Sequence, residues 1–227
     1  MKSNEYTIGD LVLYKNQQLI AFNKPSGVAV QTQDETEKSL VDLAEIYAKS
    51  NVFITHRIDQ PASGVVLLAR TSKAVASINE QFKQRKIQKT YLAVVKQAPK
   101  EESGTLTHFL ARQGNSNKSK IVEAKFPGAK EARLEYKVLD KIDNYSLLEI
   151  KLLSGRHHQI RVQLAAIGSP IKGDVKYGAR RSNGDRSIHL HSWKITFEHP
   201  ISHEAVALEA PVPNETVWQA FKFLNNG

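Results

Sequence analysis

Short apolar runs separated by polar turns dominate this chain and predict that strands outnumber helices. The most apolar run, Val65 to Ala69, predicts a buried strand. Two pairs of runs flank short polar turns at residues 15–18 and 143–144, which indicates antiparallel hairpins. The strands expected from this pattern are residues 11–14, 19–22, 65–69, 90–95, 134–139, 145–153, 188–197 and 205–208.

Four other segments repeat their apolar residues at the spacing of a helix face. The first follows Ser39, which together with Asp42 resembles a capping box. The second follows Ser72, a candidate cap. The third covers residues 155–167, and the fourth begins with Asn214 as its cap.

These elements do not alternate regularly, so a doubly wound parallel sheet is not expected. We expect an α+β fold, with a mixed, largely antiparallel central sheet and flanking helices. The length of 227 residues suits one large domain or two small ones. Residues 113–133 are polar, rich in lysine and weakly patterned, which predicts a long exposed hairpin or loop.

A formal net charge of +9 and an isoelectric point near 9.6 favour a polyanionic partner, nucleic acid above all. A basic protein that merely stays in solution is the alternative. The absence of cysteine excludes disulfides, thiol nucleophiles and cysteine-bound zinc. Residues 1–6 show no apolar signal region, and no segment approaches the roughly 20 apolar residues of a membrane span. We therefore expect a cytoplasmic protein without a membrane partner.

Asp59 is the first candidate for chemistry. It lies beside His56 and Arg57, in a turn that Pro61 favours and that leads into the buried run. Binding and catalytic residues are often found on short loops beside rigid elements. The alternative is a turn aspartate that accepts hydrogen bonds from local backbone N–H groups.

Four stretches of this chain together resemble the RluA-type family of pseudouridine synthases. They are Asn23-Lys24-Pro25-Ser26-Gly27; His56-Arg57-Ile58-Asp59 with Ser63-Gly64; Lys89-Thr90-Tyr91-Leu92-Ala93; and residues 155–162 with Gly173-Asp174 and Tyr177-Gly178. Three positions depart from the family pattern: Ala62 stands where threonine is usual, and Gln163 and Ser169 stand where histidines are common.

The resemblance implies an RNA pseudouridine synthase, an isomerase that converts specific uridines of ribosomal or transfer RNA. It implies no cofactor, and we expect a monomer. It also implies a single catalytic domain over residues 1–227, with two subdomains around an active-site cleft and no N-terminal S4 domain. By resemblance, Asp59 is the nucleophile, Arg161 orients it, and Tyr91 stacks on the target uracil.

The resemblance further suggests residues that bind substrate. Arg57 is expected to enter the RNA stack in place of the flipped uridine, and Lys24 and Arg156 to hold phosphates. His56 and Gln159 complete the expected binding set. For each basic residue by itself, a solvated surface charge is the alternative.

Histidines invite a different interpretation, because His189 and His191 would share one strand face at a spacing that suits two metal ligands. The other candidates are His157, His158 and His203. No acidic co-ligands are evident nearby in the sequence, so we expect no metal, and we expect Asp174 to organise a turn. Two functional rivals remain: an RNA-binding module that has lost catalysis, and a metal-dependent nuclease.

Overall fold

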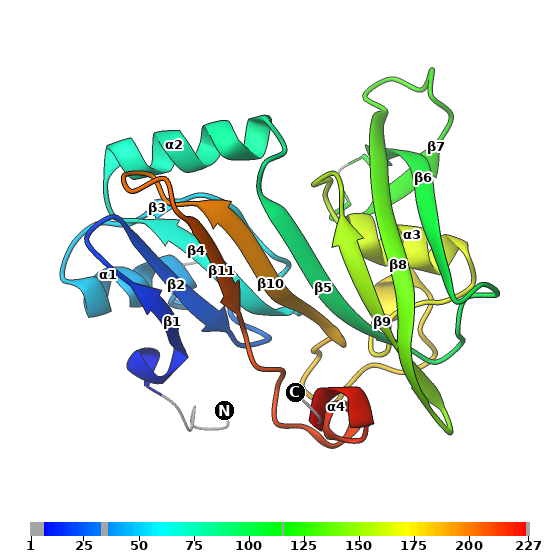
Figure 1. Ribbon diagram of the computed structural model, residues 1–227. Coiled ribbons are helices and arrows are strands. Elements are labelled where there is room, and N and C mark those ends of the chain that lie inside the picture. Colours follow the sequence, from blue (N-terminus) through cyan, green and yellow to red (C-terminus); the bar gives the residue numbers. More distant parts are fainter. Residues whose placement is uncertain (1–6, 33–35, 115, 226–227) are drawn as a thin grey trace. The chain divides into compact units, whose positions relative to one another are not determined.

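The computed structural model describes residues 7–32, 36–114 and 116–225 (Figure 1). Residues 1–6, on which the expectation about a signal region rests, lie outside this range. The chain forms two compact units. Unit 1 comprises Met1–Gln88 and Ser192–Val212, and unit 2 comprises Lys89–His191 and Pro213–Gly227. The expected α+β class is confirmed, since each unit combines antiparallel strand pairs with a few helices.

Unit 1 is a sheet with strand order β1-β2-β4-β10-β11, and β3 pairs with β4. Its elements are η1 (Ile8–Leu11), β1 (Val12–Lys15), β2 (Leu19–Lys24), α1 (Leu40–Ala48), β3 (Phe53–Ile54), β4 (Ser63–Ala69), α2 (Ser72–Lys83), β10 (Leu190–Glu198, within unit 1 from Ser192) and β11 (Ala205–Glu209). The predicted hairpin of β1 and β2 is confirmed.

Every residue of β4 is buried, as its apolar run predicted. Alternate residues of a strand face opposite sides of the sheet, so both faces must be covered. On one face, Val65 and Leu67 pack in a core cluster with Ile78 of α2. On the other, the Phe22 ring meets the Tyr47 ring of α1 edge to face, with centroids 6.4 Å apart.

The two predicted helix starts in unit 1 differ in accuracy. The capping box at α1 is confirmed, because Ser39 Oγ accepts from the Asp42 N–H (3.3 Å) and the Asp42 carboxylate accepts from the Ser39 N–H (2.8 Å). The Ser39 hydroxyl also donates to the Asp42 carboxylate (2.7 Å), and this bond, followed by the bond from the Ser39 N–H, lowers the pKa of Asp42. The cap of α2 is Thr71 rather than Ser72, since Thr71 Oγ1 accepts from the Ala74 N–H.

Unit 2 contains antiparallel strands in the order β5-β9-β8-β6-β7. Its elements are β5 (Gln88–Val95, within unit 2 from Lys89), β6 (Ser103–Arg112), β7 (Ser119–Val122), β8 (Lys130–Ile142), β9 (Tyr145–Leu152), α3 (Gln159–Ala166), η2 (Val175–Tyr177), α4 (Thr216–Gln219) and α5 (Lys222–Asn225). β6 has no counterpart in the sequence prediction. The expected exposed segment 113–133 contains β7, which forms a hairpin with β6, and the start of β8.

Two predicted helices of unit 2 need correction. α3 begins at Gln159 rather than at residue 155, because His158 adopts a left-handed conformation (φ 52°) that a helix cannot continue through. Its residues Gln159 to Leu164 are all buried, so it is not the amphipathic helix that we expected. The C-terminal helix is two short helices, and the residue before α4 is Glu215 rather than Asn214.

None of the helices within the described ranges has the length and apolar character needed to cross a bilayer.

Candidate active site

In unit 1, the turn that carries Asp59 is joined to the turn of residues 23–27. The Gly27 N–H donates to the Gln60 carbonyl (2.9 Å), and the Gln60 side-chain amide donates back to the Gly27 carbonyl (2.9 Å). Within the Asp59 turn, the Ala62 N–H donates to the Asp59 carbonyl (3.0 Å). Two motifs far apart in sequence are thus joined by hydrogen bonds into one piece of backbone that carries Asp59.

Lys24 is the centre of this arrangement. Its side chain is fully buried, and Nζ donates to the carbonyls of four residues, which are Pro25 (2.8 Å), Val28 (2.7 Å), Gln60 (3.2 Å) and Ala62 (2.7 Å). Burial lowers the pKa of Lys24 to about 7, and the charge of Asp59 opposes that shift. An ammonium group has three N–H donors, so these carbonyls occupy it. The expectation that Lys24 holds a phosphate is therefore wrong, and Lys24 instead fixes the path of the chain around Asp59.

Gly64 ends the Asp59 turn in a conformation that requires glycine. Its φ is +111°, and a Cβ atom at this position would lie 2.2 Å from the carbonyl oxygen of Ser192 on β10. The Ser63-Gly64 pair of the motif thus lets β4 and β10 approach closely where the Asp59 turn enters the sheet.

His56 and Arg57 differ in their surroundings. His56 Nε2 accepts from the Leu67 N–H (3.0 Å), and its ring lies against Phe82 with centroids 5.6 Å apart. These contacts tie the turn to β4 and α2, and the expected contact of His56 with substrate stays a prediction. Arg57 is exposed, which is compatible with a contact to RNA.

In unit 2, Arg161 forms a buried ion pair with Asp174. Its Nε and Nη2 donate to the two carboxylate oxygens at 2.7 and 2.8 Å, and both residues are almost inaccessible to solvent. Gly173, which precedes Asp174, makes room for Asn183, because its φ is +86° and a Cβ there would lie 2.6 Å from Asn183 Nδ2. The sequence analysis assigned Asp174 to a turn and missed that it is the carboxylate partner of Arg161.

Tyr91 is buried on β5, where it lies opposite Ile150 of β9. Unit 1 therefore carries Asp59, and unit 2 carries Tyr91 and Arg161. Of the three predicted catalytic residues, the two in unit 2 lie on rigid, buried elements.

A chain of hydrogen bonds surrounds the start of α3. Tyr177 Oη accepts from the Ser119 N–H (2.8 Å) and forms a hydrogen bond with His158 Nδ1 (2.8 Å). Burial, and then the charge of Arg161, lower the pKa of His158 to about 2, so this ring stays neutral. The Arg161 guanidinium lies 5.1 Å from the centre of the Tyr177 ring. The neutral histidine and the phenol thus pack beside the buried ion pair.

The Gln159 side chain forms its hydrogen bonds within the protein rather than with a substrate. Its Oε1 accepts from the Arg156 N–H (3.0 Å) and Ser154 Oγ (2.8 Å), and its Nε2 donates to the Arg133 carbonyl (3.1 Å). Because this side chain is buried, the expected role in substrate binding is wrong. Arg156 is half-buried and donates one bond to the Glu131 carbonyl, so it can still contact an anion.

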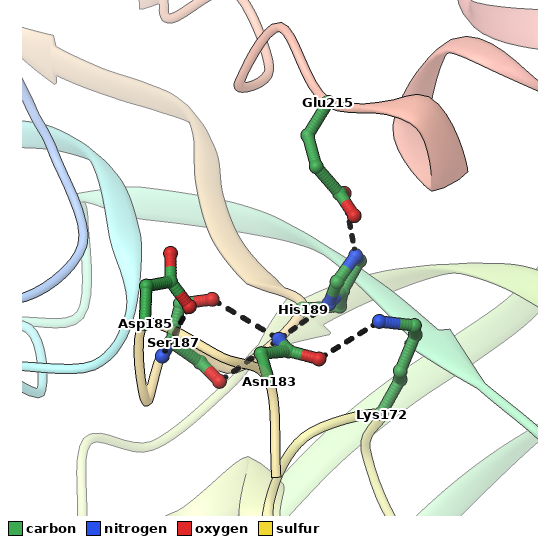
Figure 2. Close-up of polar contacts among 6 residues, drawn as sticks. All are labelled: Lys172, Asn183, Asp185, Ser187, His189 and Glu215. Atoms are coloured by element: carbon green, nitrogen blue, oxygen red, sulfur yellow. Dashed lines mark hydrogen bonds and ion pairs between the residues drawn. The ribbon is translucent and has the colours of Figure 1, made fainter.

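Figure 2 shows that His189 belongs to a polar network of unit 2. Asn183 Nδ2 donates to His189 Nδ1 (3.1 Å), while His189 Nε2 lies 2.7 Å from Glu215 Oε2. Asn183 Oδ1 in turn accepts from Lys172 Nζ (2.8 Å). Burial, and then the charge of Lys172, lower the pKa of His189. The Trp218 ring stacks on His189 with centroids 5.3 Å apart, so this network holds the C-terminal segment.

The arrangement of these histidines does not favour a metal. His157 and His158 stack with centroids 3.8 Å apart, and His157 contacts Ser119 and Asn117. Across the described parts of the chain, no three His, Cys, Asp or Glu side chains are grouped to hold a metal ion.

A family model described as RNA pseudouridylate synthase matches residues 18–166. The chain belongs to this family. The resemblance of the four motifs to the RluA-type pseudouridine synthases is thereby confirmed at the level of family.

Two relatives and one solved structure illustrate the relationship. The chain is 32% identical over 202 residues to the uncharacterized RNA pseudouridine synthase MG209 homolog of Mycoplasma pneumoniae. The matched region covers 88% of this chain and 65% of that protein. It is 28% identical to the ribosomal large subunit pseudouridine synthase C of Yersinia pestis, over 92% of this chain and 67% of that protein. The structure of human RNA pseudouridylate synthase domain containing 1 is 25% identical, with a TM-score of 0.75 over 89% of this chain and 83% of that one. The chain thus spans about two thirds of the length of the two bacterial relatives.

Two of the departures from the family pattern, Gln163 and Ser169, place buried polar atoms in unit 2. Gln163 and Ser169 are fully buried, and Gln163 Nε2 donates to the carbonyls of Leu106 and Ala132. Among the described residues, however, neither Gln163 Oε1 nor Ser169 Oγ has a hydrogen-bond partner. These positions therefore pack into unit 2 without full polar pairing.

Proposed function

We propose that this pseudouridine synthase family member isomerises uridine to pseudouridine in folded RNA. In this reaction the bond from uracil N1 to ribose C1′ breaks and a bond from uracil C5 to C1′ forms. The C5 proton is released and N1 gains a proton, so no cofactor is consumed. The observation that carries the proposal is the Asp59 turn, which is fixed by Lys24 and by the turn of residues 23–27 in a chain of this family.

Asp59 acts in this proposal as the nucleophile. A carboxylate that forms a covalent adduct divides one difficult step into two easier ones. The adduct forms either at ribose C1′ or on the pyrimidine ring, and both leave the Asp59 backbone in place.

Arg161 and Tyr91 have supporting roles. A guanidinium has five N–H donors, and two of them serve Asp174. Asp174 therefore fixes the plane of Arg161, and we propose that Arg161 orients the Asp59 carboxylate in the reacting complex. Tyr91 stacks on the flipped uracil and replaces its lost base stacking. Arg57 fills the space that the uridine leaves.

Ribosomal RNA is the first substrate to test, because the Yersinia pestis relative is named a ribosomal large subunit synthase. Transfer RNA is the second. The net charge of +9 supports a polyanionic substrate of either kind. We further propose a cytoplasmic monomer.

The test is release of tritium from RNA labelled at uridine C5, measured in EDTA. Wild type is compared with Asp59→Asn and with Glu80→Gln, a matched loss of one carboxylate from an exposed position on α2. We expect release by wild type and Glu80→Gln, and a loss of more than about a thousandfold for Asp59→Asn.

Three outcomes would contradict this proposal. Undiminished release by Asp59→Asn would remove the assigned nucleophile. Release that EDTA abolishes would indicate metal-dependent chemistry. RNA binding without release from any ribosomal or transfer RNA would favour an RNA-binding module that has lost catalysis.

A further inference from the structure

An exposed aromatic side chain lies on the connection between β7 and β8 in unit 2, drawn in green in Figure 1. Phe126 is 41% exposed. The Phe126 N–H donates to the Glu123 carbonyl (3.0 Å), and the Phe126 carbonyl accepts from the Ala129 N–H (2.9 Å). Two consecutive turns thus hold this ring at the surface instead of letting it fold into the core.

Cations surround this ring. Lys120 Nζ lies 5.0 Å from the centre of the Phe126 ring. Lys125 lines the same hollow of about 550 Å³. The one acidic residue in the lining, Glu123, approaches Lys125 at 3.5 Å, but both side chains are largely exposed, so this pair is weak.

A second hollow of about 510 Å³ adjoins the first, because Pro127 lines both. Arg112, Lys130, Arg156 and His157 contribute to its lining, and none of the lining residues is acidic. Arg112 and Lys130 are exposed at the ends of β6 and β8. The second hollow is therefore an open, positively charged depression beside an aromatic ring.

This combination fits single-stranded or looped RNA better than a protein surface. Phosphates bind to lysine and arginine in a salt-dependent way, and unstacked bases pack on exposed aromatic rings. An apolar protein partner would leave this group of cations without counter-charge.

We propose that Phe126 stacks with a base of the RNA substrate outside the target uridine, and that Arg112 and Lys130 bind neighbouring phosphates in the second hollow. This inference rests on the proposed function, because it treats RNA as the substrate. It assigns the surface from Lys120 to Lys130, together with Arg112 and Arg156, to substrate recognition by unit 2.

The test compares three variants with a control. Phe126→Leu removes the aromatic face but keeps an apolar side chain, and Phe126→Trp restores a stacking surface. Arg112→Gln with Lys130→Gln removes two cations from the depression. Lys137→Gln with Lys151→Gln removes two exposed cations from β8 and β9 of the same unit and serves as the control. Binding of a fluorescently labelled ribosomal RNA fragment is measured over a range of salt concentrations, and tritium release gives KM and kcat.

We expect Phe126→Leu to weaken RNA binding by about tenfold, with recovery in Phe126→Trp. The double substitution in the depression should lower the salt slope of log K by about 2, more than the control pair does. KM should rise in both cases while kcat stays within about twofold, since the reacting groups are untouched.

The proposed function and this inference can fail separately. If wild type binds and converts RNA but Phe126→Leu and the double variant match the control pair, this inference alone is overturned. If wild type converts no RNA, the proposed function fails, and the binding data still decide whether this surface holds RNA. If wild type binds no RNA, both are lost.

Discussion

Lys24 in unit 1 and Arg161 in unit 2 are both buried cations, but the two units stabilise them in different ways. Lys24 is surrounded by backbone carbonyls, whereas Arg161 is paired with the Asp174 carboxylate. Because Lys24 donates to neutral backbone carbonyls of four residues, it fixes the path of the main chain. The charge of Arg161 is instead neutralised by a carboxylate, that of Asp174. The comparison suggests that unit 1 positions its candidate residue through backbone geometry, and unit 2 through charge neutralisation.

The chain offers a separate optical probe for each unit. Its two tryptophans are Trp193 in unit 1 and Trp218 in unit 2. Trp193→Phe and Trp218→Phe backgrounds therefore report on one unit at a time during unfolding in urea.

The largest effect is expected for Asp174→Asn. This change leaves the buried Arg161 charge without its carboxylate, so we expect the free energy of unfolding to fall by about 3–5 kcal/mol. Urea unfolding followed through Trp218 measures it. The control is Glu102→Gln, which breaks the exposed pair with Lys141 in the same unit and should cost less than about 1 kcal/mol. Equal effects of the two substitutions would refute a special role for the buried pair.

A smaller effect is expected for Lys24→Met. Methionine fills the space but leaves buried carbonyls without a donor, which should cost about 2–3 kcal/mol, measured through Trp193. Lys83→Met on exposed α2 is the control, with no more than about 0.5 kcal/mol expected. If Lys24→Met shifts both tryptophan signals equally, the two units unfold as one cooperative structure and the contrast between them does not extend to stability.

The smallest expected effect is a loss of stability at acidic pH. Because the pKa of His158 is about 2 in the folded state and about 6.5 when unfolded, the unfolded chain takes up the proton first as pH falls. The stability that the neutral His158 ring contributes is thus present above pH 6.5 and lost below it. The free energy of unfolding should fall by about 1–2 kcal/mol between pH 6.5 and 5. His158→Asn keeps the left-handed backbone and should flatten this slope in urea unfolding followed through Trp218.

His203→Asn is the matched control, because His203 is also left-handed (φ 60°) but exposed. An unchanged slope in His158→Asn would mean that another group causes the loss of stability in acid.

Local patterns predicted the elements of unit 1 well. The run from Val65 to Ala69, the hairpin before it and the capping box at Ser39 all depend on neighbouring residues, so the sequence contains their cause. β6 was missed because much of it is exposed and mixes polar with apolar side chains, and its long partner β8 lies further along the sequence. α3 was placed too early because nothing local shows that His158 is left-handed.

The candidate site was predicted less completely than the fold. Motif resemblance named Asp59, Tyr91 and Arg161, and their roles stay proposals. Contacts between distant residues decided the corrections. The Lys24 ammonium group donates to carbonyls that include those of Gln60 and Ala62, and Asp174 is paired with Arg161. A sequence pattern shows which residue types are present, but not which of them are paired after folding.

Unit 1 is discontinuous in the chain, and this has a consequence for the order of events during synthesis. Strands β1, β2 and β4 leave the ribosome early, but Gly64 meets its neighbour Ser192 on β10 only after all of β5 to β9 has been made. The hairpins of unit 2 are local by comparison and can form first, since closing short loops costs less entropy. The apolar β4 must therefore wait with one edge uncovered, and the Asp59 turn is completed among the last parts of the molecule.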